Sequence, residues 1–153
     1  MKNRILIILS LVITVIGILV NISTIVDREP HIGNFILSLC VLTFWLVYIL
    51  LSLKSKGGLI YIFMYWLTTF VVSILGMLYS AGIMDYNAIH ILLLIFLSPI
   101  YGFRYYISLP IVNLIVLAII AFIYMYMSGY FLKKSFKKKV VETPSLPEEE
   151  NLE

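Results

Sequence analysis

Four long apolar runs, each free of charged residues, dominate the sequence. They cover about residues 5–26, 35–53, 59–82 and 107–132, and charged residues stand near their ends. A helix needs about 20 predominantly apolar residues to cross a hydrocarbon core about 30 Å thick. The pattern therefore predicts an all-α, polytopic membrane protein with four transmembrane helices.

A further apolar segment, residues 88–106, is shorter and interrupted. Ser98, Pro99 and Gly102 break its apolar run, and Arg104 adds a charge near its end. An apolar stretch of about 10–14 residues is typical of a re-entrant or interfacial piece rather than a span. Read more generously, this segment would be a fifth transmembrane helix.

The distribution of basic residues favours four spans. With four spans and both termini on one side, nine of the eleven basic residues share that side, and only Arg28 and Arg104 lie opposite. The nine are Lys2, Arg4, Lys54, Lys56, Lys133, Lys134, Lys137, Lys138 and Lys139. Five spans would divide the basic residues five against six. Because cytoplasmic flanks retain Lys and Arg, we predict cytoplasmic N- and C-termini.

The four-span topology leaves residues 88–106 on the extracytoplasmic side. We expect a short re-entrant or interfacial helix there, turning near Pro99 and Gly102 and packed as a cap over the end of the bundle. Backbone that leaves helical geometry at membrane depth must be shielded by protein. Residues 1–139 then form one transmembrane domain, and the acidic, proline-bearing residues 140–153 form a disordered cytoplasmic tail.

Composition agrees with this architecture. Hydrophobic residues make up 62% of the chain and charged residues 12%, and the mean hydropathy is +1.07. A soluble domain of this length would leave too much apolar surface in water. The net charge of +3 reflects the lysine cluster that follows the last span, which we expect to contact anionic lipid. Isoleucine and lysine usage favours a bacterial cell membrane. Membrane lipids are expected partners, and nucleic acid is not.

The spans lack the residue types that membrane enzymes and ion-coupled transporters use. No span contains an ionisable Asp, Glu, His, Lys or Arg, and such residues normally mark proton or ion pathways. Cys40 is the single cysteine, so no intramolecular disulfide forms. His31 and His90 lie on separate loops without the close spacing of a metal-ligand pair. We therefore expect no catalytic residues, no metal and no cofactor.

Small and polar residues inside the spans predict helix packing. Gly76 and Ser80 form a small-xxx-small pair, and Gly17 offers another point of close approach. Asn113 and the Thr68-Thr69 pair are expected to form hydrogen bonds between helices.

Aromatic residues inside the spans predict two further features. Trp45, Tyr48, Tyr65 and Trp66 are expected to line a cavity between helices. Tyr124, with Tyr126 and Tyr130, is expected to anchor the last helix at the membrane boundary.

The extracytoplasmic face combines charged and aromatic residues in the way that binding surfaces do. The predicted binding residues are Arg28, Asp85, His90, Tyr101, Arg104, Tyr105 and Tyr106. We therefore expect a non-enzymatic protein that binds a lipid, an amphipathic peptide or another membrane protein, as an accessory subunit or an immunity-type protein does. The alternative is a small homo-oligomeric channel, carrier or holin-like pore, with residues 88–106 as its gate.

Overall fold

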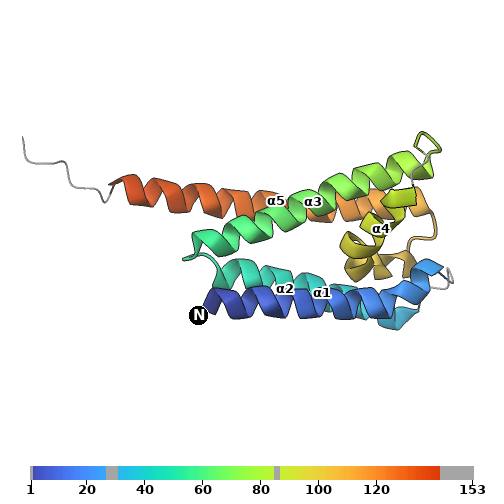
Figure 1. Cartoon of the computed structure of the whole chain (residues 1–153), viewed down its shortest axis with the longest axis horizontal. Coiled ribbons are helices and arrows are strands. Elements are labelled where there is room, and N and C mark those ends of the chain that lie inside the picture. The colour runs from blue at the N-terminus through green and yellow to red at the C-terminus, as the bar shows by residue number, and fades with distance from the viewer. Residues whose placement is uncertain (1, 27–30, 85–86, 142–153) are drawn as a thin grey trace, which may run out of the picture.

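The chain folds into helices throughout the part that the structure describes. The computed structural model describes residues 2–26, 31–84 and 87–141, which contain five α-helices, one 3-10 helix and no strand (Figure 1). The elements are α1 (Lys2–Val26), α2 (Ile32–Leu51), α3 (Lys56–Ser80), α4 (Asn87–Phe96), the 3-10 helix η1 (Ser98–Tyr105) and α5 (Pro110–Val141).

Four of these helices are long and apolar enough to span a membrane. The qualifying segments are Arg4–Ile22, Ile32–Leu51, Lys56–Ser80 and Pro110–Phe136. The prediction of an all-α chain with four such helices is confirmed. The last helix begins at Pro110 rather than near residue 107, as expected of a residue whose missing N–H costs nothing in a first turn.

The C-terminal boundary is later than expected. Helix α5 continues through the lysine cluster to Val141, so residues 140 and 141 are helical and not part of a tail. The remainder of the predicted tail, residues 142–153, lies outside the described residues.

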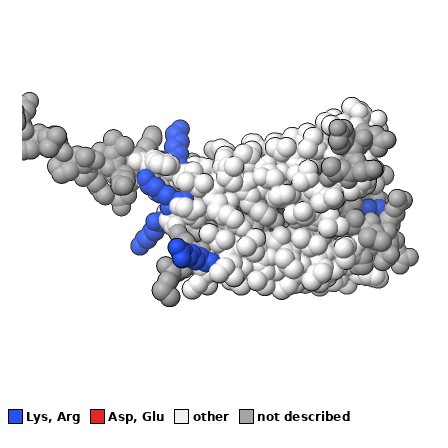
Figure 2. Space-filling model, in the orientation of Figure 1, with Lys and Arg blue, Asp and Glu red and all other residues white. Residues whose placement is uncertain are grey.

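The long helices form two pairs. Helix α1 packs on α2, and α3 packs on α5, so that two layers run side by side (Figure 1). Helix α4 and η1 lie between the two layers, at the end away from the N-terminus. Lys and Arg side chains gather where α1 begins and α2 connects to α3 (Figure 2). We call this the lysine-rich end, and we call α4 together with η1 the wedge.

The wedge position corrects the expected cap. Residues 88–106 were expected as a short re-entrant or interfacial helix that turns near Pro99 and Gly102 and packs as a cap over the end of the bundle. They form two elements that are separated by Leu97, and η1 packs against α1 and α2 between the two layers rather than over their ends (Figure 1). Ser98, Pro99 and Gly102 are all buried there.

Side-chain amides of the first helix pair fasten the wedge. The Asn21 Nδ2 donates to the Ser98 carbonyl at 2.8 Å. The Asn34 Nδ2 donates to the Asn21 Oδ1 at 2.9 Å and to the Val20 carbonyl at 3.0 Å. Both asparagines are buried, and an unpaired amide or carbonyl at such a site would cost several kcal/mol. The first carbonyl of η1 thus receives a side-chain donor from α1.

Ser38 provides a second attachment. Its Oγ donates to the Pro99 carbonyl at 3.3 Å and accepts from the Gly102 N–H at 3.1 Å. A Cβ at Gly102 would overlap the carbonyl of Asn34, and a Cβ at Gly17 would lie 2.9 Å from the Cα of Pro99. The wedge therefore fits because glycine stands at both contact points.

The lysine-rich half of the bundle is filled by aromatic rings. Trp45 stacks on Tyr65 with ring centroids 4.3 Å apart, and Trp66 stacks on Tyr124 at 4.5 Å. Both tryptophans are buried. The expected cavity between these residues is thus occupied by their own rings. Tyr124 is partly buried against the core and is not a boundary anchor, because its hydroxyl donates to the carbonyl of Leu42 at 2.8 Å.

Replacing Gly102 with alanine is expected to destabilise the fold. The added methyl overlaps the Asn34 carbonyl, and overpacking of this kind costs about 1–3 kcal/mol or more. Gly33→Ala is the matched control, because a Cβ there meets nothing within 4 Å. Thermal unfolding in detergent should show a lowered Tm for Gly102→Ala and an unchanged or raised Tm for Gly33→Ala. Equal Tm values for the two variants would contradict the close contact.

Candidate functional site

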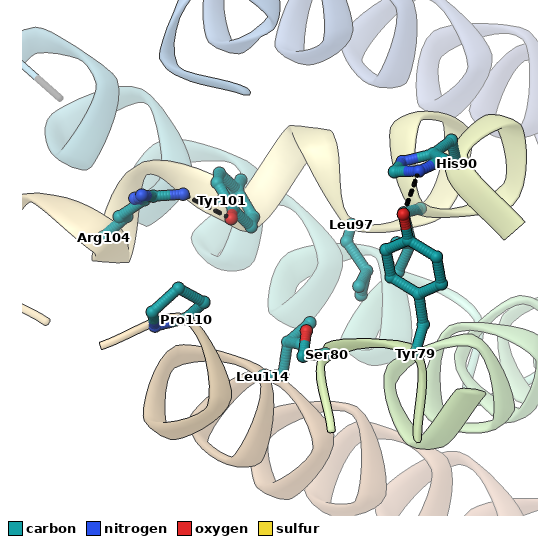
Figure 3. Close-up of a pocket in the computed structure, with 9 residues that line it drawn as sticks. Tyr79, Ser80, His90, Leu97, Tyr101, Arg104, Pro110 and Leu114 are labelled. Carbon is teal, nitrogen blue, oxygen red and sulfur yellow. Dashed lines mark hydrogen bonds between the residues drawn. The ribbon is translucent and has the colours of Figure 1, made fainter. Parts of the chain in front are cut away.

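A pocket of about 310 Å³ lies at the wedge end of the bundle (Figure 3). Residues from α3, α4, η1 and α5 line it, so it exists only because the wedge meets the second helix pair. The lining residues are Tyr79, Ser80, His90, Leu93, Leu97, Tyr101, Arg104, Pro110 and Leu114.

Two hydrogen-bonded polar pairs stand on opposite sides of the pocket (Figure 3). On one side an Arg104 guanidinium N–H donates to the Tyr101 hydroxyl at 2.9 Å. A 3-10 helix has three residues per turn, so these two side chains share one face of η1. On the other side His90 Nε2 and the Tyr79 hydroxyl lie 2.7 Å apart, joining α4 to α3.

Leucine side chains separate the polar pairs. Leu93, Leu97 and Leu114 line the pocket between the four elements. A Cβ at Gly76 would lie 2.7 Å from the Leu93 Cδ2 and 3.3 Å from the Leu114 Cδ2. Glycine at this position therefore lets both leucines approach α3. Ser80, four residues later, is exposed and lines the pocket instead of packing between helices.

The charge of the pocket is positive among the described residues. Arg104 is the cation on the wedge, and all eight Asp and Glu residues of the chain lie outside the described ranges. A guanidinium carries five N–H donors, of which Tyr101 accepts one. Helix α5 also begins at Pro110 on the pocket wall, with the positive end of its dipole there. The arrangement suits an anionic group attached to an apolar body.

The described residues offer binding chemistry. Within the described ranges, no group of three His, Cys, Asp or Glu side chains is placed to hold a metal ion. The polar side chains of the pocket are instead arranged as a guanidinium, hydroxyls and an imidazole around leucines, and such groups fix the orientation of a bound molecule.

The structure brings some of the predicted binding residues together and separates others. His90, Tyr101 and Arg104 line one pocket. Tyr105 and Tyr106 are exposed and do not line it. Tyr106 packs edge-on against Phe35 of α2, with ring centroids 4.8 Å apart. The two remaining predicted residues, Arg28 and Asp85, lie outside the described residues.

The prediction that Asn113, Thr68 and Thr69 form hydrogen bonds between helices is wrong within the described residues. Asn113 is buried, and neither polar atom of its side chain has a partner among the described residues. The hydroxyls of Thr68 and Thr69 donate to carbonyls of their own helix, at Met64 and Tyr65 respectively. Hydrogen bonds between elements come instead from other side chains, among them Asn21, Asn34 and Ser38, which the sequence did not single out.

The bond between His90 and Tyr79 should contribute measurably to the α3–α4 contact. A neutral hydrogen bond contributes about 0.5–1.5 kcal/mol, and a double-mutant cycle isolates that coupling. Tyr79→Phe, His90→Ala and the double variant should show a coupling free energy in the lower part of this range, because the pair is exposed. Unfolding in mixed detergent measures it. A cycle with Tyr105→Phe and His90→Ala, which are not joined by this bond, should show no coupling.

Comparison with protein-family models, with curated proteins and with solved structures gives no match for this chain. No activity or partner is therefore carried over from a relative. The function is inferred from the pocket and from the four membrane-length helices.

Proposed function

We propose that this chain is a non-enzymatic, multi-pass protein of a bacterial cell membrane that binds an amphipathic partner in the pocket at its wedge end. A lipid, an amphipathic peptide and a segment of another membrane protein all have the required chemistry. An accessory subunit or an immunity-type protein would work in this way. The observation that carries the proposal is one pocket that combines the Arg104 guanidinium with a leucine lining.

The rigid attachment of the wedge supports a binding role. Asn21 and Ser38 hold the carbonyls of Ser98 and Pro99, directly before the turns that carry Tyr101 and Arg104. A site whose side chains are already in place loses less conformational entropy on binding. The wedge therefore presents its cation at a defined position before any partner arrives.

The proposed orientation places the lysine-rich end in the cytoplasm and the wedge on the outer side as a re-entrant segment. Support comes from the gathering of basic side chains at one end of the bundle (Figure 2) and from the retention of Lys and Arg on cytoplasmic flanks. The packing of η1 against α1 and α2 supplies the shielding by protein that backbone outside α-helical geometry requires at membrane depth.

Reporter fusions test the orientation. Alkaline phosphatase, which folds only outside the cytoplasm, should be active when fused after Arg104 and inactive when fused after Lys139. Green fluorescent protein at the same two sites should give the opposite result. Activity of the phosphatase after Lys139 would place the lysine-rich end outside and contradict the proposal.

Binding of a dansyl-labelled undecanoic acid, an anionic amphiphile, tests the pocket. The full chain in neutral detergent should increase dansyl emission, and Arg104→Ala should weaken binding about tenfold, the equivalent of about 1.4 kcal/mol. Lys134→Ala removes a cation from the opposite end and should leave binding unchanged. The Tyr105→Ala/Tyr106→Ala double variant should also leave binding unchanged, because neither exposed tyrosine lines the pocket. Equal binding by wild type and Arg104→Ala would contradict the pocket as the site.

A homo-oligomeric channel or carrier is the second candidate, and one observation favours it. Several buried polar atoms have no partner among the described residues, including Trp45 Nε1, Trp66 Nε1 and both polar atoms of Asn113. A permeating polar solute or water would satisfy such groups. Protein alone in liposomes should then raise glycerol flux, and Asn113→Leu should lower it. If the protein-containing liposomes show no glycerol flux above that of empty liposomes, the channel is excluded and the binding function is favoured.

A further inference from the structure

We propose that the pocket binds the phosphate head group of an anionic membrane phospholipid, with Arg104 contacting the phosphate. The inference rests on the proposed function and names the ligand of that same site. The acyl chains of the lipid would lie against the outer surface of the bundle beside the pocket.

Arg104 has donors to spare for a phosphate. Tyr101 accepts one N–H of the guanidinium at 2.9 Å, and within the described part of the chain no other hydrogen bond or ion pair of Arg104 is formed. Tyr101 also holds the guanidinium in place, since the two share a face of η1. A guanidinium binds a phosphate through two parallel N–H···O bonds, so the remaining donors match this anion.

The pocket lies at the level along the bundle where lipid head groups are expected. Ser80 is the last residue of α3 and Pro110 is the first of α5, and both line the pocket. Each helix is long enough to span the hydrocarbon core, so their ends at this side mark its boundary. Phospholipid head groups occupy the layer just outside that core.

The surroundings of the pocket favour a lipid over a water-borne peptide. Large apolar side chains stand exposed within three residues of pocket-lining positions in the chain. They are Ile83, Ile91 and Leu109, which are 70%, 63% and 64% exposed. Their exposed apolar surface suits hydrocarbon chains. An acidic peptide arriving from water would instead gain from a rim of several cations, and the described wedge carries Arg104 alone.

The size and the far side of the pocket suit a head group with hydroxyls. A volume of about 310 Å³ is near the lower end of small-molecule sites, which are about 300–1,000 Å³. That space holds a phosphoglycerol group and excludes two acyl chains. The His90–Tyr79 pair and the Ser80 hydroxyl lie across the pocket from Arg104 (Figure 3), where they would bond glycerol hydroxyls. Phosphatidylglycerol is the lipid class that combines these features.

Photo-crosslinking locates the lipid directly. The full chain in nanodiscs of neutral phosphatidylcholine receives a trace of phosphatidylglycerol that carries a diazirine near its head group, and mass spectrometry maps the adducts. Wild type and Lys134→Gln should carry adducts on the wedge. Arg104→Gln should lose at least nine-tenths of them, and Arg104→Lys should retain an intermediate amount because it keeps the charge but not the paired donors. If Arg104→Gln fails to elute as a folded species, the Arg104→Lys comparison carries the test.

Competitors separate the lipid from other sources of the same chemistry. Unlabelled phosphatidylglycerol should displace the probe at least tenfold more effectively than diacylglycerol or oleate, and inorganic phosphate should not displace it. Displacement by inorganic phosphate alone would overturn the lipid assignment. Equal displacement by oleate or by an acidic amphipathic peptide would overturn the phosphate while leaving the proposed function intact. Absence of wedge adducts, together with no dansyl-undecanoate binding, would overturn both.

Discussion

Hydrogen bonds from side chains to the backbone carbonyls of Ser98 and Pro99, at the start of η1, are the interactions on which the rest of this structure depends. Both residues are buried where α4 has ended and η1 begins, and a buried polar group that lacks hydrogen-bond partners costs free energy. Asn21 donates to the Ser98 carbonyl, and Ser38 donates to the Pro99 carbonyl. Asn34 in turn orients Asn21, so three side chains on two helices act as one unit.

The position of the wedge then determines how the two helix pairs meet. On its side of the bundle the wedge fills the space between them, and the second pair closes over it through Gly76, which lets Leu93 and Leu114 approach. Towards the lysine-rich end the same space is filled by the ring of Trp45, which stacks on Tyr65 and meets Trp66 edge-on. Large rings are therefore needed where the wedge is absent, and small residues where it is present.

The pocket is a consequence of this packing. Tyr101 and Arg104 are carried by a 3-10 helix whose first residues are fixed, while His90 is carried by α4 and bonded to Tyr79 of the second pair. A membrane protein that exposes apolar surface to lipid on its long helices gains its specificity from such polar groups at their ends. The proposed recognition of a phosphate uses the cation at that position, beside the leucine lining of the pocket.

The sequence by itself determined the elements. Charge-free runs of sufficient length predicted four helices, and Pro99 with Gly102 predicted the interruption, because backbone chemistry acts locally and the bilayer sets helix length. Gly17 was also recognised as a point of close approach, although its partner Pro99 was not. Only the tertiary structure decided that residues 88–106 enter between the helix pairs, that Asn21 meets Ser98, and that Tyr79 meets His90. These contacts join residues that lie far apart in the chain. A polar residue in an apolar run also looks the same in the sequence whatever it bonds. Asn21 bonds another element, whereas Asn113 has no side-chain partner among the described residues.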